Sequence, residues 1–259
     1  MNNGTVMFEV TRLNKGERSN AELSFARESP VTIILNDQEL VTLLCSPIDL
    51  KYLAVGYLSS EGFIENKDEI GNVLVDNKNG IVRVQTIKDE PTIQFNQYKR
   101  MITSGCGRGV SFYSEADIAT QKIDSQIQVY SNNIFELVRE FQTGSQIYKE
   151  THGVHSAALC SEKRIIVFNE DIGRHNAIDK VFGKCMLEDI NIDDLMVVTS
   201  GRISSEIVYK VARWRTPIIV SISAPTGLGV KIAESMGITL ISSVRGKRMN
   251  IYTNDWRLQ

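Results

Sequence analysis

The rhythm of apolar and polar positions changes about halfway along the chain. Up to about residue 130, short β-branched or leucine-rich runs alternate with turn-forming Asn, Asp and Gly residues, a pattern typical of β-hairpins. One helix interrupts them after Pro47, because apolar residues recur there at helical spacing. The predicted hairpins join residues 31–35 to 40–44 and residues 72–76 to 81–87. Residues 1–130 are therefore predicted to form a smaller, strand-rich N-terminal part.

Residues 131–259 have the pattern of an α/β domain. A predicted hairpin is followed by strands that alternate with helices, and the strands are apolar throughout. Such strands indicate a sheet covered by helices on both faces, which predicts a three-layer α/β/α sandwich. The predicted strands are 154–160, 164–168, 195–199, 217–222, 238–241 and 250–252, and the helices are 177–187, 204–214 and 228–236.

Composition excludes several classes of protein. Apolar residues make up 42% of the 259 residues and the formal net charge is -2, so we expect neither nucleic acid nor a membrane as a partner. The polar N-terminus has no apolar signal core, and no stretch is long enough to span a bilayer. The four cysteines are widely spaced without a CxxC pair, which favours reduced thiols over disulfides or a zinc site. A cytoplasmic protein without a tightly bound metal is expected.

Cys106 is the first candidate for chemistry. It lies in residues 103–109 among three glycines, two hydroxyl residues and an arginine. Glycines let the backbone turn sharply and leave the sulfur uncovered. A thiol that another molecule must reach, and that must ionise, needs an open and electropositive setting of this kind. The alternative is a turn residue without chemistry, and the residues around Cys106 do not decide between the two.

Three loops of the C-terminal half follow strand ends, where open α/β sheets bind their ligands. They span residues 169–176, 199–206 and 223–227. The last two each open a helix with Ser and Gly, and such helix N-termini are natural sites for phosphate or other anions. Capped helix starts and ordinary turns are the alternative explanation of the same residues.

Two further groups of side chains allow two interpretations each. Residues 243–248 contain three cations, all within the four positions 245–248. The segment is either a binding loop or a solvated basic turn. His152 and His155 would point to one face of an extended segment and could bind a metal. Two histidines without a third ligand are weak evidence for a metal, so a hydrogen-bonded structural role is the default for each.

Several of these runs, taken together, resemble the FdhD family, the sulfur carriers for formate dehydrogenase. The resemblance covers roughly residues 30–254, and its most specific part is the run from Glu170 to Lys180. The matching runs, in the family's order, are 103–107, 153–158, 170–180, 200–202, 223–225, 245–246 and 250–253.

The resemblance implies that Cys106 accepts persulfide sulfur from a cysteine desulfurase and passes it to the cofactor of formate dehydrogenase. That cofactor is molybdenum (or tungsten) held by bis-molybdopterin guanine dinucleotide, of which GDP is a fragment. It also implies that the C-terminal half resembles the cytidine deaminase fold. The residues expected to bind the cofactor are His175, Ser200, Gly201, Arg202, Ser223, Ser243, Val244, Arg245, Gly246, Lys247 and Arg248.

One departure from the family limits the mechanism. Many members carry CxxC in the cysteine loop, whereas this chain has Gly109 at the second position. A mechanism that needs two cysteines does not fit this chain, but a single persulfide carrier is chemically sufficient.

Two alternative functions and the oligomeric state stay open. A chaperone that only binds the cofactor through its guanine nucleotides would show the same loops. A deaminase-like hydrolase is disfavoured, because the zinc ligands of H-x-E and P-C-x-x-C are missing. Phe and Tyr residues of the N-terminal half could serve a homodimer.

Overall fold

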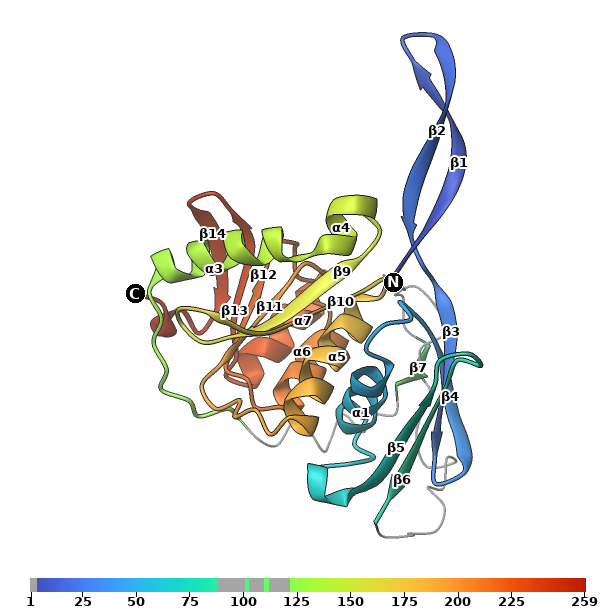
Figure 1. Cartoon of the computed structure of the whole chain (residues 1–259). Helices are drawn as coiled ribbons and strands as arrows, with labels where there is room; N and C mark the ends of the chain where they lie inside the picture. Colours follow the sequence, from blue (N-terminus) through green and yellow to red (C-terminus); the bar gives the residue numbers. More distant parts are fainter. Residues whose placement is uncertain (1–3, 88–100, 103–109, 112–121) are drawn as a thin grey trace.

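The structure is a computed structural model that describes residues 4–87, 101–102, 110–111 and 122–259 (Figure 1). The predicted cysteine loop, with Cys106 and Gly109, lies outside the described residues.

Within the described residues, the largest sheet has six strands in the order β10-β9-β11-β12-β13-β14. The central strands β11 and β12 are four residues long and buried throughout, as their β-branched sequences predict for a sheet covered on both faces. The strands are β9 (His155–Cys160), β10 (Ile165–Asp171), β11 (Met196–Thr199), β12 (Ile218–Ser221), β13 (Thr239–Arg245) and β14 (Arg248–Thr253).

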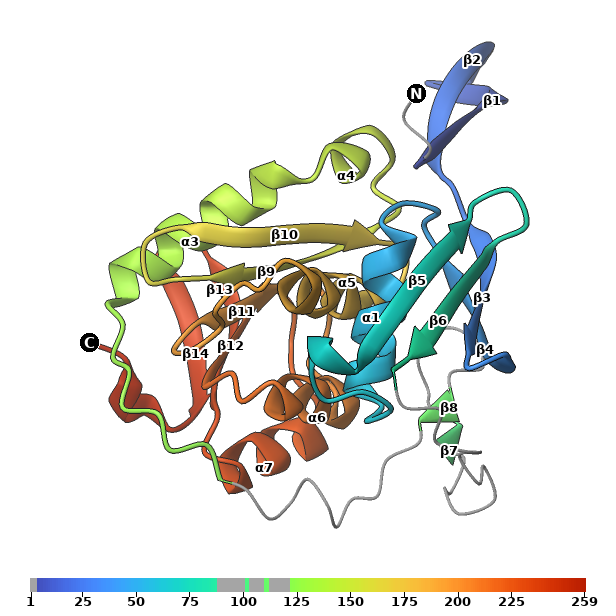
Figure 2. The ribbon, with the colours of Figure 1, turned by 60° about the horizontal axis from the view of Figure 1, so that its bottom comes forward.

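Helices cover both faces of this sheet, as predicted. On one side lie α3 (Ser131–Gly144) and the short α4 (Gln146–Thr151). On the other lie α5 (Arg174–Leu187), α6 (Ser205–Arg213) and α7 (Gly227–Ser235), and Figure 2 shows α3 across the sheet from α6 and α7. Successive residues of β11 pack into opposite cores, Val197 toward α5 to α7 and Val198 toward α3. The mixed α/β class is confirmed, whereas the likeness to the cytidine deaminase fold stays a prediction.

The described part of the N-terminal half holds a four-stranded sheet in the order β4-β3-β6-β5, with α1 packed on it. Both predicted hairpins and the predicted helix are present. The elements are β3 (Ser29–Leu35), β4 (Gln38–Cys45), α1 (Leu50–Ser60), the 3-10 helix η1 (Lys67–Glu69), β5 (Ile70–Asp76) and β6 (Ile81–Thr86). After β6 the chain enters the segment that contains Cys106. The predicted domain boundary at residue 130 stays a prediction.

The N-terminal sheet meets the α/β layers where α1 lies along α5 (Figure 1). A buried ion-pair cluster joins the two helices to α6. Lys210 Nζ lies 3.0 Å from Asp179 Oδ1 and 3.2 Å from Glu61 Oε1, and Ser60 Oγ donates a hydrogen bond to Asp179 Oδ1 at 2.7 Å. We call these four residues the Lys210 cluster. Each buried charge in it therefore has an opposite charge or a hydroxyl beside it.

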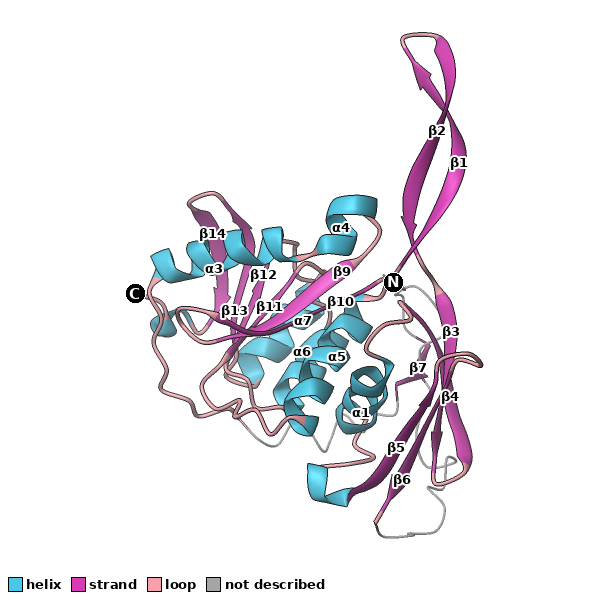
Figure 3. Ribbon diagram, in the orientation of Figure 1, coloured by secondary structure: helices cyan, strands magenta, loops and turns pink. Residues whose placement is uncertain are grey.

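A long hairpin extends from the body of the molecule, formed by β1 (Thr5–Asn14) and β2 (Glu17–Ala26) (Figure 3). It was not predicted. Alternate residues share one face of the ribbon, so the register places six apolar side chains together. Phe8 and Phe25 on this face are 56% and 40% exposed, with ring centroids 5.6 Å apart. This apolar face consists of Val6, Phe8, Val10, Ala21, Leu23 and Phe25. A short pair, β7 (Met101–Ile102) with β8 (Val110–Ser111), completes the described strands.

Two sequence predictions for the α/β half need correction. Residues 169–176 were expected to form a loop, but β10 continues to Asp171 and α5 begins at Arg174. His152 and His155 do not share an extended segment, because His152 ends α4 with a φ of 53°. The ring of His152 packs against Tyr148, with centroids 5.1 Å apart.

Candidate functional site

Several loops meet at one edge of the six-stranded sheet. β9 is antiparallel to both β10 and β11, and β12 is parallel to β11 and β13. The carboxyl ends of β10, β11, β12 and β13 therefore lie along one edge, which we call the loop edge. The start of α5, the loops 200–204 and 222–226 and the turn 246–247 all follow these strand ends. The structure thus gathers the predicted binding loops at the edge where α/β sheets bind ligands.

Ser200 fastens the loop after β11 to the start of β9. Its Oγ accepts a hydrogen bond from the backbone N–H of Ser156 at 2.9 Å and lies 3.2 Å from Nδ1 of His155. Its own backbone N–H donates to the carbonyl oxygen of Ser156 at 3.0 Å. The Ser200 hydroxyl is therefore engaged within the protein, where it holds the His155 ring at the loop edge.

The first turn of α5 places Arg174 and His175 against neighbouring loops. A Cβ built on Gly201 would lie 2.7 Å from Cβ of Arg174, so this close approach requires glycine. Nε2 of His175 lies 2.9 Å from Oε2 of Glu206, a residue in the first turn of α6. Both side chains are less than one-quarter exposed, at 22% and 23%. The starts of α5 and α6 are thus linked through an imidazole and a carboxylate.

Positive charge dominates the electrostatics around this link. Burial lowers the pKa of His155, and the charges of Arg174, His175 and Arg202 lower it further. Burial alone would raise the pKa of Glu206, but its hydrogen bond with His175 and the nearby positive charges hold that pKa below its usual value. A neutral His155 and an ionised Glu206 are therefore the favoured forms near pH 7.

The Ser223 loop is connected to both neighbouring strands. Ser221 Oγ donates to the carbonyl oxygen of Gly201 at 2.8 Å and accepts from the backbone N–H of Ser223 at 2.9 Å. The backbone N–H of Ser243 donates to the carbonyl oxygen of Ser223 at 3.3 Å. Ser243 has a φ of 56° within a bulge of β13, an unusual conformation for a residue other than glycine.

The predicted basic turn connects β13 to β14 at the loop edge. Val220 of β12 pairs with Ile241, so Arg245 stands three residues past the level of Ser221, beyond the end of β12. Arg245, Lys247 and Arg248 are exposed, whereas the Val244 side chain is buried beneath α3. Four strand spacings, or about 19 Å, separate β10 from β13. Whether these residues bind the cofactor stays a prediction.

The structure places three of the four cysteines in the interior. Cys45, Cys160 and Cys185 are buried, and burial raises the pKa of each thiol to about 12. At neutral pH these thiols carry almost no thiolate, the form that attacks sulfur or binds metals.

Sequence reasoning did not identify Glu206 as a site residue, although it lies in the predicted loop 199–206. An acidic residue in the first turn of a helix looks like a response to the helix dipole. Its pairing with His175, 31 positions earlier, is visible only in the fold.

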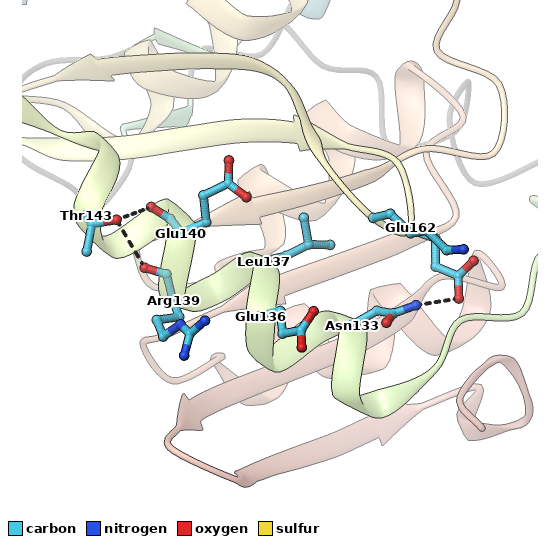
Figure 4. A pocket seen from close by; sticks show the side chains of 8 residues that line it. Asn133, Glu136, Leu137, Arg139, Glu140, Thr143 and Glu162 are labelled. Atoms are coloured by element: carbon cyan, nitrogen blue, oxygen red, sulfur yellow. Dashed lines mark hydrogen bonds between the residues drawn. The ribbon is translucent and has the colours of Figure 1, made fainter.

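A separate surface groove lies away from the loop edge, between α3 and the β9–β10 turn (Figure 4). Its lining is of mixed charge and includes Glu136, Arg139, Glu140, Glu162 and Lys163. Asn133 Nδ2 donates to Glu162 Oε1 at 2.7 Å across one end of it. None of the predicted site residues that the structure describes lines this groove.

Two broader features concern the described residues only. No group of three or more His, Cys, Asp or Glu side chains among them is placed to hold a metal ion. None of the helices in this part of the chain is both long and apolar enough to cross a membrane.

The chain is similar to proteins of one family over almost its full length. A model of the FdhD/NarQ family matches residues 26–259. "Sulfur carrier protein FdhD" of Bacillus subtilis (strain 168) is 40% identical over 256 residues, which cover 98% of both chains. The protein of the same name from Staphylococcus aureus (strain MRSA252) is 38% identical over 96% of this chain and 94% of its own. A crystal structure of a putative formate dehydrogenase accessory protein from Desulfotalea psychrophila has a TM-score of 0.79 and 28% identity, covering 98% of this chain and 99% of that one.

Proposed function

Because the chain belongs to the FdhD/NarQ family, we propose that it is a sulfur carrier in the maturation of formate dehydrogenase. In this proposal Cys106 takes persulfide sulfur from a cysteine desulfurase. The chain then passes that sulfur to the molybdenum cofactor, which is its cargo rather than a resident group.

The burial of the other cysteines is the observation that carries this proposal. A sulfur carrier needs a thiol that ionises near neutral pH and that a second protein can reach. Cys45, Cys160 and Cys185 meet neither condition, since all are buried with pKa values of about 12. Cys106 is the remaining cysteine, and its glycine-rich sequence suits such a thiol.

The loading step is a thiolate–persulfide exchange. The Cys106 thiolate attacks the terminal sulfur of the donor persulfide and forms a new S–S bond. The S–S bond of the donor breaks, and the donor cysteine leaves as a thiolate. One sulfur atom moves without an added oxidant or reductant, so one cysteine is sufficient for this step.

The loop edge supports binding of the guanine dinucleotide part of the cofactor. Arg174 and Arg202 supply positive charge near His155, and the basic turn supplies three more cations across the sheet. Arginine pairs with phosphate through two parallel hydrogen bonds, and a neutral imidazole can donate one more. The two groups lie on opposite sides of the edge, so a cofactor with two guanine dinucleotide ends can place one GDP unit at each.

Intact-protein mass spectrometry tests the sulfur-carrier role directly. After incubation with a cysteine desulfurase and cysteine, the wild-type chain should gain one sulfur atom, and Cys106→Ala should gain none. Cys160→Ala is the matched control and should load as the wild type does. Loading of Cys106→Ala would overturn the proposal. Binding of GDP without sulfur loading in the wild type would instead favour the chaperone function.

A further inference from the structure

A buried carboxylate lies where the N-terminal sheet meets the loop edge. Asp171, the last residue of β10, pairs with Lys180 of α5, and Lys180 Nζ lies 2.7 Å from Asp171 Oδ2. Both side chains are completely buried. Buried charges are costly to desolvate, and replacement of such a pair by apolar residues is often neutral or stabilising. Stability alone is therefore a weak explanation for this pair.

The Asp171 carboxylate binds backbone groups from both parts of the molecule. Its Oδ2 accepts a hydrogen bond from the backbone N–H of Ser46 at 3.0 Å, just after β4 ends. Its Oδ1 accepts from the backbone N–H of Gly173 at 2.8 Å and from Nδ2 of Asn176 at 2.9 Å. One carboxylate thus fixes the end of β4 and the residue directly before Arg174.

Lys180 and Ser46 complete the same junction. Lys180 Nζ donates to the carbonyl oxygens of Ser46 at 3.2 Å and Glu170 at 3.3 Å. Ser46 Oγ accepts from the backbone N–H of Ile172 at 3.1 Å. The turn at 172–173 is therefore held by the N-terminal sheet as well as by its own strand.

We infer that Asp171 and Lys180 are a positioning pair, which sets the start of α5 at the loop edge only when the N-terminal sheet is docked. Through its hydrogen bond with Gly173, the pair sets the position of Arg174 and His175. Through its hydrogen bond with Ser46, it holds the N-terminal sheet, after which the chain continues into the Cys106 segment. Both side chains are buried away from solvent, so neither is exposed to contact a ligand. The functional part of this inference rests on the proposed function, because it concerns the alignment of sulfur donor and cofactor site.

Replacement of the whole pair separates positioning from stability. Asp171→Asn/Lys180→Met leaves no unpaired buried charge, so the double variant should be more stable than either single variant. Gly173 and Ser46 donate to different oxygens of the Asp171 carboxylate, and an Asn side chain keeps an acceptor oxygen in only one of these two positions. The matched control is Glu61→Gln/Asp179→Asn/Lys210→Met, which neutralises the Lys210 cluster, including Asp179 on the same helix as Lys180, without touching the 172–173 turn.

Hydrogen exchange of the native protein is the direct readout. In the double variant, the amide of Ser46 or Gly173 should exchange at least tenfold faster than in the wild type. GDP affinity measured by calorimetry should fall about tenfold. In the control variant both quantities should stay within twofold of the wild type.

Each outcome decides a separate question. Unchanged exchange at both amides in the folded double variant would overturn the positioning role. Changed exchange with unchanged GDP affinity would reduce the pair to a structural junction. If the wild type itself does not bind GDP, the proposed nucleotide site fails, while the exchange comparison still decides positioning. Should the double variant not fold, Ser46→Ala removes only the acceptor of the Ile172 N–H and should speed exchange at that amide.

Discussion

Gly56 of α1 and Gly183 of α5 lie against each other where the two helices cross. A Cβ built on Gly183 would come within 2.6 Å of the backbone nitrogen of Gly56 and 1.9 Å of the carbonyl oxygen of Tyr52. A Cβ built on Gly56 would lie 1.8 Å from the carbonyl oxygen of Asp179. The two backbones are in direct contact, so a side chain at either position must push the helices apart.

Gly183→Ala should therefore lower the free energy of unfolding by about 1–3 kcal/mol, the usual cost of overpacking. Helix propensity alone would give the opposite sign, since Ala exceeds Gly by up to about 1 kcal/mol within helices. Urea unfolding measures the change. The control is Gly227→Ala in α7, where an added Cβ meets no atom within 4 Å. Equal effects of the two substitutions would contradict the close contact.

Thiol labelling should distinguish Cys106 from the other cysteines. A thiol with a pKa of about 12 is ionised in about one molecule in ten thousand at pH 8, since each pH unit is a factor of ten. Iodoacetamide at pH 8 should thus modify one cysteine in the native chain and four in urea. Peptide mapping identifies the site. Rapid native labelling of Cys45 or Cys185 would show that the interior thiols are accessible.

Stability should fall as the solution becomes mildly acidic, partly through His155. The pKa of His155 is lowered in the folded state, first by burial and then by nearby cations. As pH falls from 7 through the usual value of about 6.5, the unfolded chain binds a proton that the folded site resists. His155→Asn should flatten this slope in the free energy of unfolding between pH 7 and 5.5.

The basic turn should contribute to cofactor affinity. Loss of one hydrogen bond to a charged group costs roughly 1.5–3 kcal/mol, so Arg245→Ala should weaken GDP binding on the order of tenfold to a hundredfold. Sulfur loading of Cys106 should continue in this variant. Arg83→Ala, an exposed arginine of β6, is the control. If Arg245→Ala binds GDP with full affinity, residues 243–248 are a solvated turn and not part of the binding site.

The hairpin of β1 and β2 should promote self-association through its apolar face. An isolated two-stranded ribbon is at best marginally stable in water, and Phe8 and Phe25 are both exposed on one face. We expect a concentration-dependent dimer in sedimentation experiments, weakened by Phe8→Ser/Phe25→Ser. Met7→Ser, an apolar residue on the opposite face, should have little effect. A wild-type chain that stays monomeric at high concentration would refute this role.

Local sequence patterns predicted most of the sheet but not all of the fold. β11 and β12 were predictable because runs of three or four β-branched or apolar residues leave few alternatives. The helix α3 was not predicted, although its buried residues Ile134, Leu137, Val138 and Phe141 recur at helical spacing. This spacing, with polar residues between, is that of an amphipathic helix, so the signal was present in the sequence and was overlooked. The hairpin of β1 and β2 was missed because its exposed strands are rich in charged and polar residues.

The connections within the candidate site were beyond such patterns. Loops after strand ends could be assigned to one edge of a sheet from the order of elements alone. The hydrogen bond from Ser46 to Asp171 joins residues 125 positions apart, and no local pattern encodes it. The same holds for the approach of Arg174 to Gly201, which depends on the packing of α5 against a loop from another strand.

The Lys210 cluster also has a consequence for synthesis of the chain. Glu61 and Lys210 are 149 positions apart, so at roughly 5–20 residues per second the ribosome needs about 7–30 s to make the second after the first. Once residue 86 is made, α1 and its sheet are complete in sequence, but Lys210, which pairs with Glu61 at the end of α1, is still to be made. Until α5 and α6 are made, the N-terminal sheet therefore exposes the face of α1 that these helices later bury. Such an exposed surface is a natural target for ribosome-associated chaperones.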